Sequence, residues 1–244
     1  MCTLSIIPNN HQTIITMNRD EQRDRPEVGH LSTDDGRYFP IDGRSQGTWV
    51  GVNHYGLTCA LLNRYQDKHL EQGAQSRGGL IPQLLNAENL NGAEEILNNI
   101  TFNNFNPFDL IVTKDSEIIH VQWNGKEQRI ITQNLRAPFF ITSSSERVDE
   151  VIKHREDIFK NFTTPNTENG ISANLVLNNL HLKQGEENNR SSIFMQRERT
   201  HTKSITQIIT DNNTADIFYW TENKLPLNVF KNTSIHEYIS LNNK

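Results

Sequence analysis

Cysteine is scarce in this sequence of 244 residues, which contains only Cys2 and Cys59. Two cysteines cannot build a disulfide framework, and these two do not form the paired CxxC motifs of a zinc site. The 9 histidines show neither an HxH nor an HExxH spacing, and no glycine-rich phosphate-binding motif follows an expected strand. We therefore expect neither a metal site nor a bound cofactor.

Long hydrophobic runs and clusters of positive charge are also lacking. No apolar run approaches the roughly 18 residues that a membrane helix needs, and the chain start lacks the basic region of a secretory signal. The net charge of -5, with arginines mixed among acidic residues, argues against nucleic acid as a partner. These features predict a cytoplasmic protein that acts on a small molecule, and the length suits a single domain over residues 1–244.

Local patterns place strands at both ends of the chain and helices between them. Short apolar stretches bounded by turn residues predict strands at 3–7, 13–17, 47–53, 57–63, 108–113, 118–123, 128–132, 139–142, 192–195, 204–210 and 217–221. Apolar spacing predicts helices at 76–86, 91–99, 145–162, with Ser145 as N-cap, and 171–182. A polar loop is expected before residue 47, and the tail from residue 223 has no clear pattern. This order favours an α+β fold with mainly antiparallel sheets and segregated helices.

The position of Cys2 is the strongest functional signal. Methionine aminopeptidase removes Met1 readily when the next side chain is small, and Cys2 would then begin the mature chain. Its α-amine, with a reference pKa of about 7.7–8.0, would share one Cα with a thiol whose reference pKa is about 8.5. Such a pair is a nucleophile with its own base, as in N-terminal threonine enzymes. The alternative is a chance Met-Cys start.

A hairpin would bring a charged segment beside this terminus. The expected strands 3–7 and 13–17 flank turn residues at 8–11, which is the pattern of an antiparallel pair. If residues 7 and 13 face each other, counting back along the ladder places Cys2 opposite Asn18. The segment that follows Asn18 would then lie next to the new N-terminus.

The charged segment offers two supporting groups for the nucleophile. Asp20 would accept hydrogen bonds from the α-amine, and Arg19 would favour the thiolate over the thiol. Because side chains alternate between the faces of a strand, Asn18 and Asp20 share one face and Arg19 lies on the other. This alternation ranks Asp20 above Arg19. The alternative is that the segment forms a solvated charged turn.

A second set of candidates lies near the expected strand at 57–63. Asn63 ends this strand, where its amide can donate to an oxyanion, a contact worth about 2.7–4 kcal/mol in other enzymes; the alternative is a turn-forming asparagine. Trp49 either lines a pocket or packs in the core, and Cys59 is expected to pack as a small apolar residue. The catalytic candidates are Cys2, Asp20, Arg19 and Asn63, and the candidates for substrate binding are Asn18, Trp49 and Arg64.

Several motifs recur together, in this order, in a known family. They are Met1-Cys2-Thr3, Asn18-Arg19-Asp20-Glu21 with Arg25-Pro26, GTWVGVN at 47–53, GLTCALLNRY at 56–65, Ser76-Arg77-Gly78, and Ser191-Ser192-Ile193-Phe194. Through these motifs the chain resembles the NRDE family, which is the family of transport and Golgi organisation protein 2. The matches span nearly the whole chain, so their joint specificity is high.

The resemblance implies the N-terminal-nucleophile (Ntn) hydrolase fold, a four-layer αββα sandwich of two packed, mainly antiparallel sheets flanked by helices. It also implies distant similarity to choloylglycine hydrolases and penicillin V acylases, which cleave linear amides with an N-terminal cysteine. Those enzymes carry an arginine where this chain has Met17, an asparagine near Thr142–Ser144, and a late arginine near Lys203. Arg19, at the next position, is a candidate substitute for the arginine missing at Met17, so two or three of the five expected supporting groups are altered in this chain.

Two functional hypotheses follow. The first is an amidohydrolase in which Cys2 attacks a linear carbon–nitrogen amide bond of a small molecule. The second is a non-catalytic protein that uses the same cleft to hold haem or an acyl lipid, a hypothesis that the altered supporting positions motivate. A scaffold protein is a third alternative, and it would present an exposed apolar patch.

Overall fold

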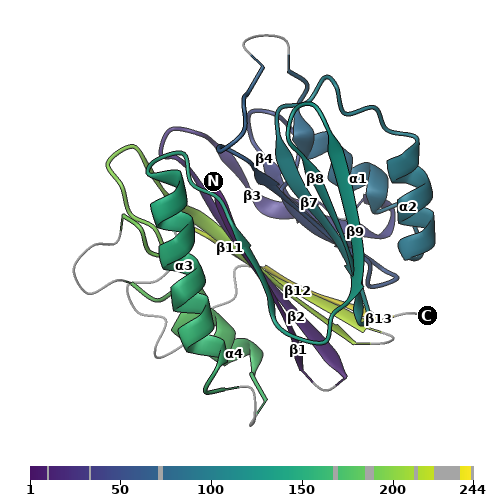
Figure 1. Cartoon of the computed structure of the whole chain (residues 1–244). Helices are drawn as coiled ribbons and strands as arrows, with labels where there is room; N and C mark the ends of the chain where they lie inside the picture. The colour runs from purple at the N-terminus through teal and green to yellow at the C-terminus, as the bar shows by residue number, and fades with distance from the viewer. Residues whose placement is uncertain are drawn as a thin grey trace.

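The computed structural model describes residues 1–9, 11–32, 34–70, 74–166, 170–184, 190–211, 214–222 and 237–242. Two β-sheets pack face to face, and helices cover the outer face of each (Figure 1). Among the described residues, none of the helices combines the length and the apolar content required to cross a bilayer.

The first sheet joins the beginning of the chain to its end. It contains six strands in the order β10-β1-β2-β11-β12-β13, and every neighbouring pair is antiparallel. The strands are β1 (Cys2–Asn9), β2 (Gln12–Gln22), β10 (Phe139–Thr142), β11 (Thr200–Asp211), β12 (Thr214–Thr221) and β13 (Glu237–Asn242). The strand β1 therefore lies inside the sheet, next to the edge strand β10 and paired on its other side with β2.

The second sheet follows the chain in sequence order. Its seven antiparallel strands run from β3 to β9. They are β3 (Glu27–Ser32), β4 (Arg37–Asp42), β5 (Val50–Asn53), β6 (Thr58–Asn63), β7 (Phe108–Lys114), β8 (Glu117–Trp123) and β9 (Gln128–Asn134). Within this sheet β6 is the strand that packs against β1 of the first sheet.

The helices form two separate outer layers. The short 3-10 turn η2 (Arg77–Gly79) leads into α1 (Leu80–Leu84), and α2 (Leu90–Asn98) follows it on the second sheet. On the first sheet lie α3 (Val148–Thr163) and α4 (Ala173–Val176), the latter continuing into the π-helix η4 (Leu177–His181). A further 3-10 turn, η1 (Asp34–Gly36), precedes β4.

Alternation along the strands produces three apolar cores and hence four layers. In the first sheet the paired residues Ile6 and Ile15 face the second sheet, whereas the next pair, Ile7 and Ile14, packs under α3 and η4. In the second sheet, Cys59 packs under α1 and α2 with the helix side chains, and its neighbour Ala60 joins the central core. The fold is thus the expected αββα sandwich.

Most of the expected elements are confirmed, with exceptions where local patterns were weak. The expected polar loop before residue 47 contains β3 and β4, the latter with a proline in its middle. Residues 192–195 form no strand. Ser145 does not cap α3, which begins after Arg147; the Ser145 hydroxyl instead contacts the Met1 sulfur at 3.2 Å.

The register of the first hairpin differs by one residue from the sequence expectation. Cys2 pairs with Arg19 and not with Asn18. The ladder continues to the pair Asn9 and Gln12, and it matches Ile7 with Ile14, whereas residues 7 and 13 were expected to pair. A one-residue shift exchanges the two faces of a strand. Arg19 therefore shares the face of Cys2 between the sheets, and Asn18 and Asp20 point toward the helices, as their side-chain partners there confirm.

A close glycine contact ties the loop before β5 to the turn η2. The Thr48 amide donates to the Gly78 carbonyl at 3.1 Å. A Cβ atom built on Gly47 would lie 2.8 Å from the Gly78 Cα, so no side chain fits between the two backbones. This contact sets the position of the 76–78 segment.

We expect Gly47→Ala to lower the free energy of unfolding by about 1–3 kcal/mol, because the added methyl group overpacks a backbone contact. Gly79→Ala is the matched control, since a Cβ there meets no atom within 4 Å and should stabilise the protein by about 0.4–1 kcal/mol. Urea unfolding of both variants measures the difference. Equal stabilities would contradict the close contact.

A buried arginine fastens α3 to the first sheet. Arg155 has 0% exposure, and its Nη1 donates to the hydroxyls of Thr3 and Thr142 at 2.9 and 3.0 Å. Its Nη2 lies 3.3 Å from the carboxylate of Asp20, which is also fully buried and accepts a second bond from Thr202. Through this pair and its hydroxyl partners, the helix is linked to four strands, β1, β2, β10 and β11, the first of which carries Cys2.

We expect Arg155→Met to destabilise the protein by about 3–5 kcal/mol, because it leaves the Asp20 carboxylate buried without its cation. The double variant with Asp20→Asn should lose less than the sum of the two single losses, with a coupling of about 0.5–3 kcal/mol. Chemical denaturation of the four proteins provides the cycle. Strict additivity would show that the two charges do not interact.

Candidate active site

A cleft of about 350 Å³ opens between the two sheets where β1 begins. This volume falls at the lower end of the range of small-molecule sites. Its lining combines strand residues with the loops before β5 and α1: Met1, Cys2, Arg19, Asp20, Glu21, Arg25, Asp42, Ser45, Gly47, Thr48, Trp49, Leu61, Asn63, 74–78 and Asn106. The lining is largely polar and charged.

Cys2 borders this cleft with its side chain between the sheets. The residue is 8% exposed, and burial raises the pKa of its thiol above the usual value. Its backbone nitrogen donates to the Ser143 hydroxyl at 3.1 Å, and its carbonyl accepts from the Ser143 amide at 2.9 Å. When Met1 is removed this nitrogen becomes the α-amine, so Ser143 is the hydroxyl that faces the new amine.

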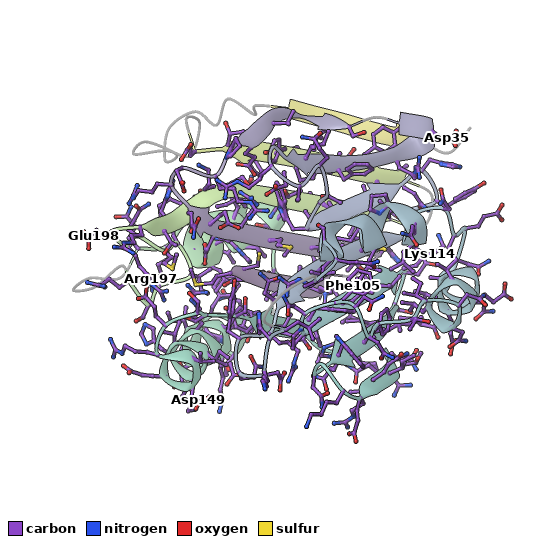
Figure 2. All side chains as sticks on the ribbon, turned by 90° about the horizontal axis from the view of Figure 1, so that it is seen from above. Asp35, Phe105, Lys114, Asp149, Arg197 and Glu198 are labelled. Atoms are coloured by element: carbon purple, nitrogen blue, oxygen red, sulfur yellow. The ribbon has the colours of Figure 1, made fainter. Side chains whose placement is uncertain are left out.

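Met1 occupies the place next to Cys2 in the unprocessed chain. Its amine donates to the Asp20 backbone carbonyl at 2.9 Å, and its sulfur contacts Ser145 and, at 3.4 Å, Nη1 of Arg197. Figure 2 shows Arg197 on the same side of the molecule as Asp149 of α3 and away from Lys114. Loss of Met1 would therefore free space beside Cys2 that polar side chains border.

The charge of the Met1 amine makes it a poor base. Burial lowers its pKa, but the neighbouring Tyr65, Cys2 and the carboxylates of Glu21 and Asp20 outweigh burial and raise the pKa to about 10. The amine is then protonated at neutral pH, and the nitrogen of Cys2 is an amide. Base catalysis by the chain terminus therefore requires removal of Met1.

Arg19 is the cation on the face of Cys2. Its guanidinium lies 4.4 Å from the centre of the Trp49 ring, forms an ion pair with Asp42, and comes within 3.8 Å of Glu27. The charge of Arg19 lowers the pKa of the Cys2 thiol, in opposition to burial. Arg19 Nη1 and Trp49 Nε1 are both buried without a hydrogen-bond partner among the described residues.

Asp20 borders the cleft through its backbone, and its carboxylate points to the opposite face of the sheet. There it binds Arg155 and Thr202. The group that receives the Met1 amine is the Asp20 carbonyl and not the carboxylate. The sequence ranked Asp20 above Arg19 as a partner of Cys2. In the structure the Arg19 side chain shares the face of Cys2, and the Asp20 carboxylate lies on the other face.

Asn18 lies outside the cleft, in a sealed polar cluster. Its side chain binds the carbonyls of His181 and Ile193, and its Oδ1 lies 2.6 Å from His181 Nδ1. The other ring nitrogen of His181 lies 2.7 Å from the Ser5 hydroxyl. Burial lowers the pKa of His181 to about 3, so the ring is neutral. Because Ser5, Asn18 and His181 all have 0% exposure, this Ser–His–Asn arrangement joins layers of the fold and meets no substrate.

Asn63 and its neighbour Arg64 have different surroundings. Asn63 borders the cleft at the end of β6, and its Nδ2 donates to the Tyr65 hydroxyl at 3.0 Å, which leaves one amide hydrogen free of that bond. Arg64 is outside the lining and binds Asp67 at 2.6 Å and Asp109 at 3.1 Å. Of the pair, Asn63 is the residue placed to contact a substrate.

Asp42, Arg25 and Arg77 border the cleft but were not singled out from the sequence as site residues. Asp42 accepts from Arg25 at 2.7 Å and from the Ser45 amide at 2.8 Å. Burial favours the protonated form of Asp42, but these bonds and the charge of Arg19 hold the pKa of its carboxyl well below the usual range. The Arg25-Pro26 and Ser76-Arg77-Gly78 motifs gave a local signal for two of these residues, whereas Asp42 had none, because it reaches the cleft through the packing of separate strands.

The remaining positions at which the chain departs from the related acylases are also placed. Lys203 lies outside the lining and binds the Arg23 carbonyl and Glu222, each at 3.1 Å. The Thr142 hydroxyl donates to the Cys2 carbonyl, and the Ser143 hydroxyl accepts from the Cys2 backbone nitrogen. The 142–144 segment therefore contacts the Cys2 backbone through the hydroxyls of Thr142 and Ser143.

The lining does not suit a metal or haem. Among the described residues no group of three histidine, cysteine or acidic side chains is arranged to hold a metal ion. The cleft lining contains no histidine, and its apolar members are few beside the charged ones. Cys2 and Met1 of the lining are residue types that can ligate haem iron, but the space around them is small and largely polar and charged, unlike an apolar haem slot.

Three solved structures with a similar fold are named as hydrolases. The structure of a Caenorhabditis elegans N-acylethanolamine-hydrolyzing acid amidase ortholog matches with a TM-score of 0.55 and 14% identity, over 85% of this chain and 92% of that chain. Two variants of the conjugated bile acid hydrolase of Clostridium perfringens match over 100% of this chain and 97% of theirs, with TM-scores of 0.53 and 0.51 and identities of 12% and 11%. At this identity the likeness establishes the fold, the Ntn-hydrolase fold.

Family membership follows from the sequence profile. A search of curated proteins finds no significant match. The profile described as "Transport and Golgi organisation 2" matches residues 1–225, which is nearly the whole chain. The chain belongs to the Transport and Golgi organisation 2 family.

Proposed function

We propose that this protein is an N-terminal cysteine hydrolase that cleaves a linear carbon–nitrogen amide bond of a small molecule after Met1 has been removed. The observation that carries the proposal is the placement of Cys2 at the cleft, with Asn63 in the same lining and the Cys2 nitrogen facing Ser143. A nucleophile, a base on the same residue and a polar donor then meet in one small space.

The proposed reaction has two steps. The α-amine of Cys2 takes the thiol proton, and the thiolate attacks the amide carbonyl; the C–N bond breaks and the leaving amine takes that proton. Water then attacks the resulting thioester, releasing a carboxylic acid and restoring the thiol. Asn63 Nδ2 and a backbone N–H would donate to the oxyanion in both steps, while the Arg19 charge favours the thiolate.

The activities for which the structural neighbours are named support this class of reaction. One neighbour is an acid amidase that hydrolyses N-acylethanolamine, and the other is a hydrolase of conjugated bile acid. One of the two solved forms of the bile acid hydrolase carries alanine in place of a cysteine at its second residue, the position that Cys2 has here. A carrier of haem or acyl lipid finds less support, because the cleft is small and its lining is charged.

Removal of Met1 should increase the reactivity of Cys2 at neutral pH. A fusion protein that is cleaved directly before Cys2 supplies the processed chain, and the uncleaved fusion supplies the control. Processing places an ammonium group on the Cα of Cys2, which favours the thiolate, and it opens the buried site; we expect iodoacetamide to react about tenfold faster or more at pH 7.5. Mass spectrometry of the peptides measures the rate.

Cys59 serves as the internal control in the same experiment. It is 0% exposed, and burial raises the pKa of its thiol far above the usual range, so it should stay unlabelled in both proteins. Equal labelling rates of Cys2 before and after processing would remove the basis for an N-terminal nucleophile.

The hydrolase itself is tested with a panel of activated acyl compounds and N-acyl amides. The processed protein should form a thioester at Cys2 that turns over, and Cys2→Ala should abolish both. Asn63→Ala should lower kcat by about 10²–10³ through loss of an oxyanion donor. The control Asn91→Ala, on the exposed side of α2, should keep full activity. Turnover by Cys2→Ala equal to that of the parent protein would refute the mechanism.

A further inference from the structure

Three arginines border the cleft, and two of them are neutralised within it. Arg19 and Arg25 both form ion pairs with the Asp42 carboxylate, and Arg25 also lies 3.9 Å from Glu21. Arg77 is the third, and among the described residues no carboxylate lies within ion-pair distance of its guanidinium. Of the three arginines in the lining, Arg77 is therefore the one whose charge is not balanced by a carboxylate among the described residues.

The guanidinium of Arg77 is held in place. Nη1 donates to the Pro107 carbonyl at 2.8 Å, and the next residue, Gly78, contacts the backbone of Gly47 so closely that a Cβ on either would clash. A guanidinium has five N–H donors, and this single bond uses one of them. The hydrogen bond to Pro107 and the closely packed backbone at Gly78 thus hold the side chain in position, and most of its N–H donors remain available for a ligand.

The partial burial of Arg77 makes an unbalanced charge costly. Desolvation disfavours the charged form of a buried group, and burial lowers the pKa of Arg77 here. A buried cation is stabilised when an anion with matching geometry approaches it, and a carboxylate matches the planar guanidinium. Since Arg77 and Cys2 border the same cleft, an anion bound to Arg77 would belong to the molecule that meets the Cys2 sulfur.

From this arrangement we infer that Arg77 binds a carboxylate of the substrate, so that the amides cleaved are small anionic ones. The inference rests on the proposed hydrolase function for its substrate and adds the charge that the substrate carries. The carboxylate can lie on the acyl side or on the amine side of the scissile bond. Arg77 is in either case a substrate-binding residue that is distinct from the groups that activate the thiol.

A pair of small reagents tests the anion site without reference to hydrolysis. Iodoacetate and iodoacetamide both alkylate the Cys2 thiolate with loss of iodide, and they differ by the negative charge. The ratio of their rates is independent of the thiol pKa, because both react with the same thiolate. In the processed protein, Arg77→Gln should lower the iodoacetate-to-iodoacetamide ratio about tenfold, the size of one charge-assisted contact.

Two further variants complete the alkylation experiment. Arg77→Lys keeps the charge and should retain most of the ratio. Arg129→Gln makes the same substitution on the exposed part of β9 and should leave the ratio unchanged. An unchanged ratio in Arg77→Gln, or an equal fall of both rates, overturns the inference, since the latter would mean that Arg77 acts on the thiolate. Circular dichroism and thermal unfolding confirm that each variant is folded.

Matched amides then locate the carboxylate. N-Hexanoylglycine is compared with N-hexanoylethanolamine for the amine side, and glutaryl-p-nitroanilide with pentanoyl-p-nitroanilide for the acyl side. We expect one charged amide to be preferred about tenfold in kcat/KM and Arg77→Gln to lose that preference.

The two experiments separate the two proposals. If the iodoacetate-to-iodoacetamide ratio depends on Arg77 but no amide is cleaved, the anion site is retained and the result counts against the hydrolase. Cleavage of neutral and charged amides at equal rates, with a ratio that does not depend on Arg77, would retain the hydrolase and overturn the anion site.

Discussion

The pairing of β1 with β2 is the constraint on which the site depends. Because Cys2 pairs with Arg19, the thiol and a guanidinium lie on the same face of the sheet, between the two layers of strands. One residue further along, Asp20 turns to the helix side and binds Arg155. A shift of the ladder by one residue would exchange these two environments and place the carboxylate beside the sulfur.

Charges are buried on both sides of this sheet, and each side balances them differently. On the helix side, Arg155 and Asp20 are both fully buried, and hydroxyls of Thr3, Thr142 and Thr202 complete their hydrogen bonds. On the cleft side, Asp42 serves two arginines, and Arg77 is left without an acidic partner among the described residues. The helix side therefore stabilises the fold, and the cleft side retains a charge that a ligand can meet.

In the proposed enzyme, removal of Met1 is the step that allows Cys2 to react. Met1 is almost fully buried, its amine is bound by a backbone carbonyl, and its sulfur contacts the buried Arg197. In the unprocessed chain these contacts fill the space beside Cys2, whose nitrogen is an amide and whose thiol has a pKa that burial raises. Removal of one residue would supply the base and open the space in the same event.

The sequence by itself determined the family, most of the antiparallel strands and Cys2 as the candidate nucleophile, because these depend on local patterns and on motifs that can be read without a structure. It also identified Arg19, Asn63 and Trp49, which do border the cleft. Only the tertiary structure decided the hairpin register, the sealed contacts of Asn18 and the ion pairs of Arg64. It also brought Asp42 and Arg77 to the cleft that Cys2 borders, because contacts between separate strands and loops depend on packing that no local pattern records.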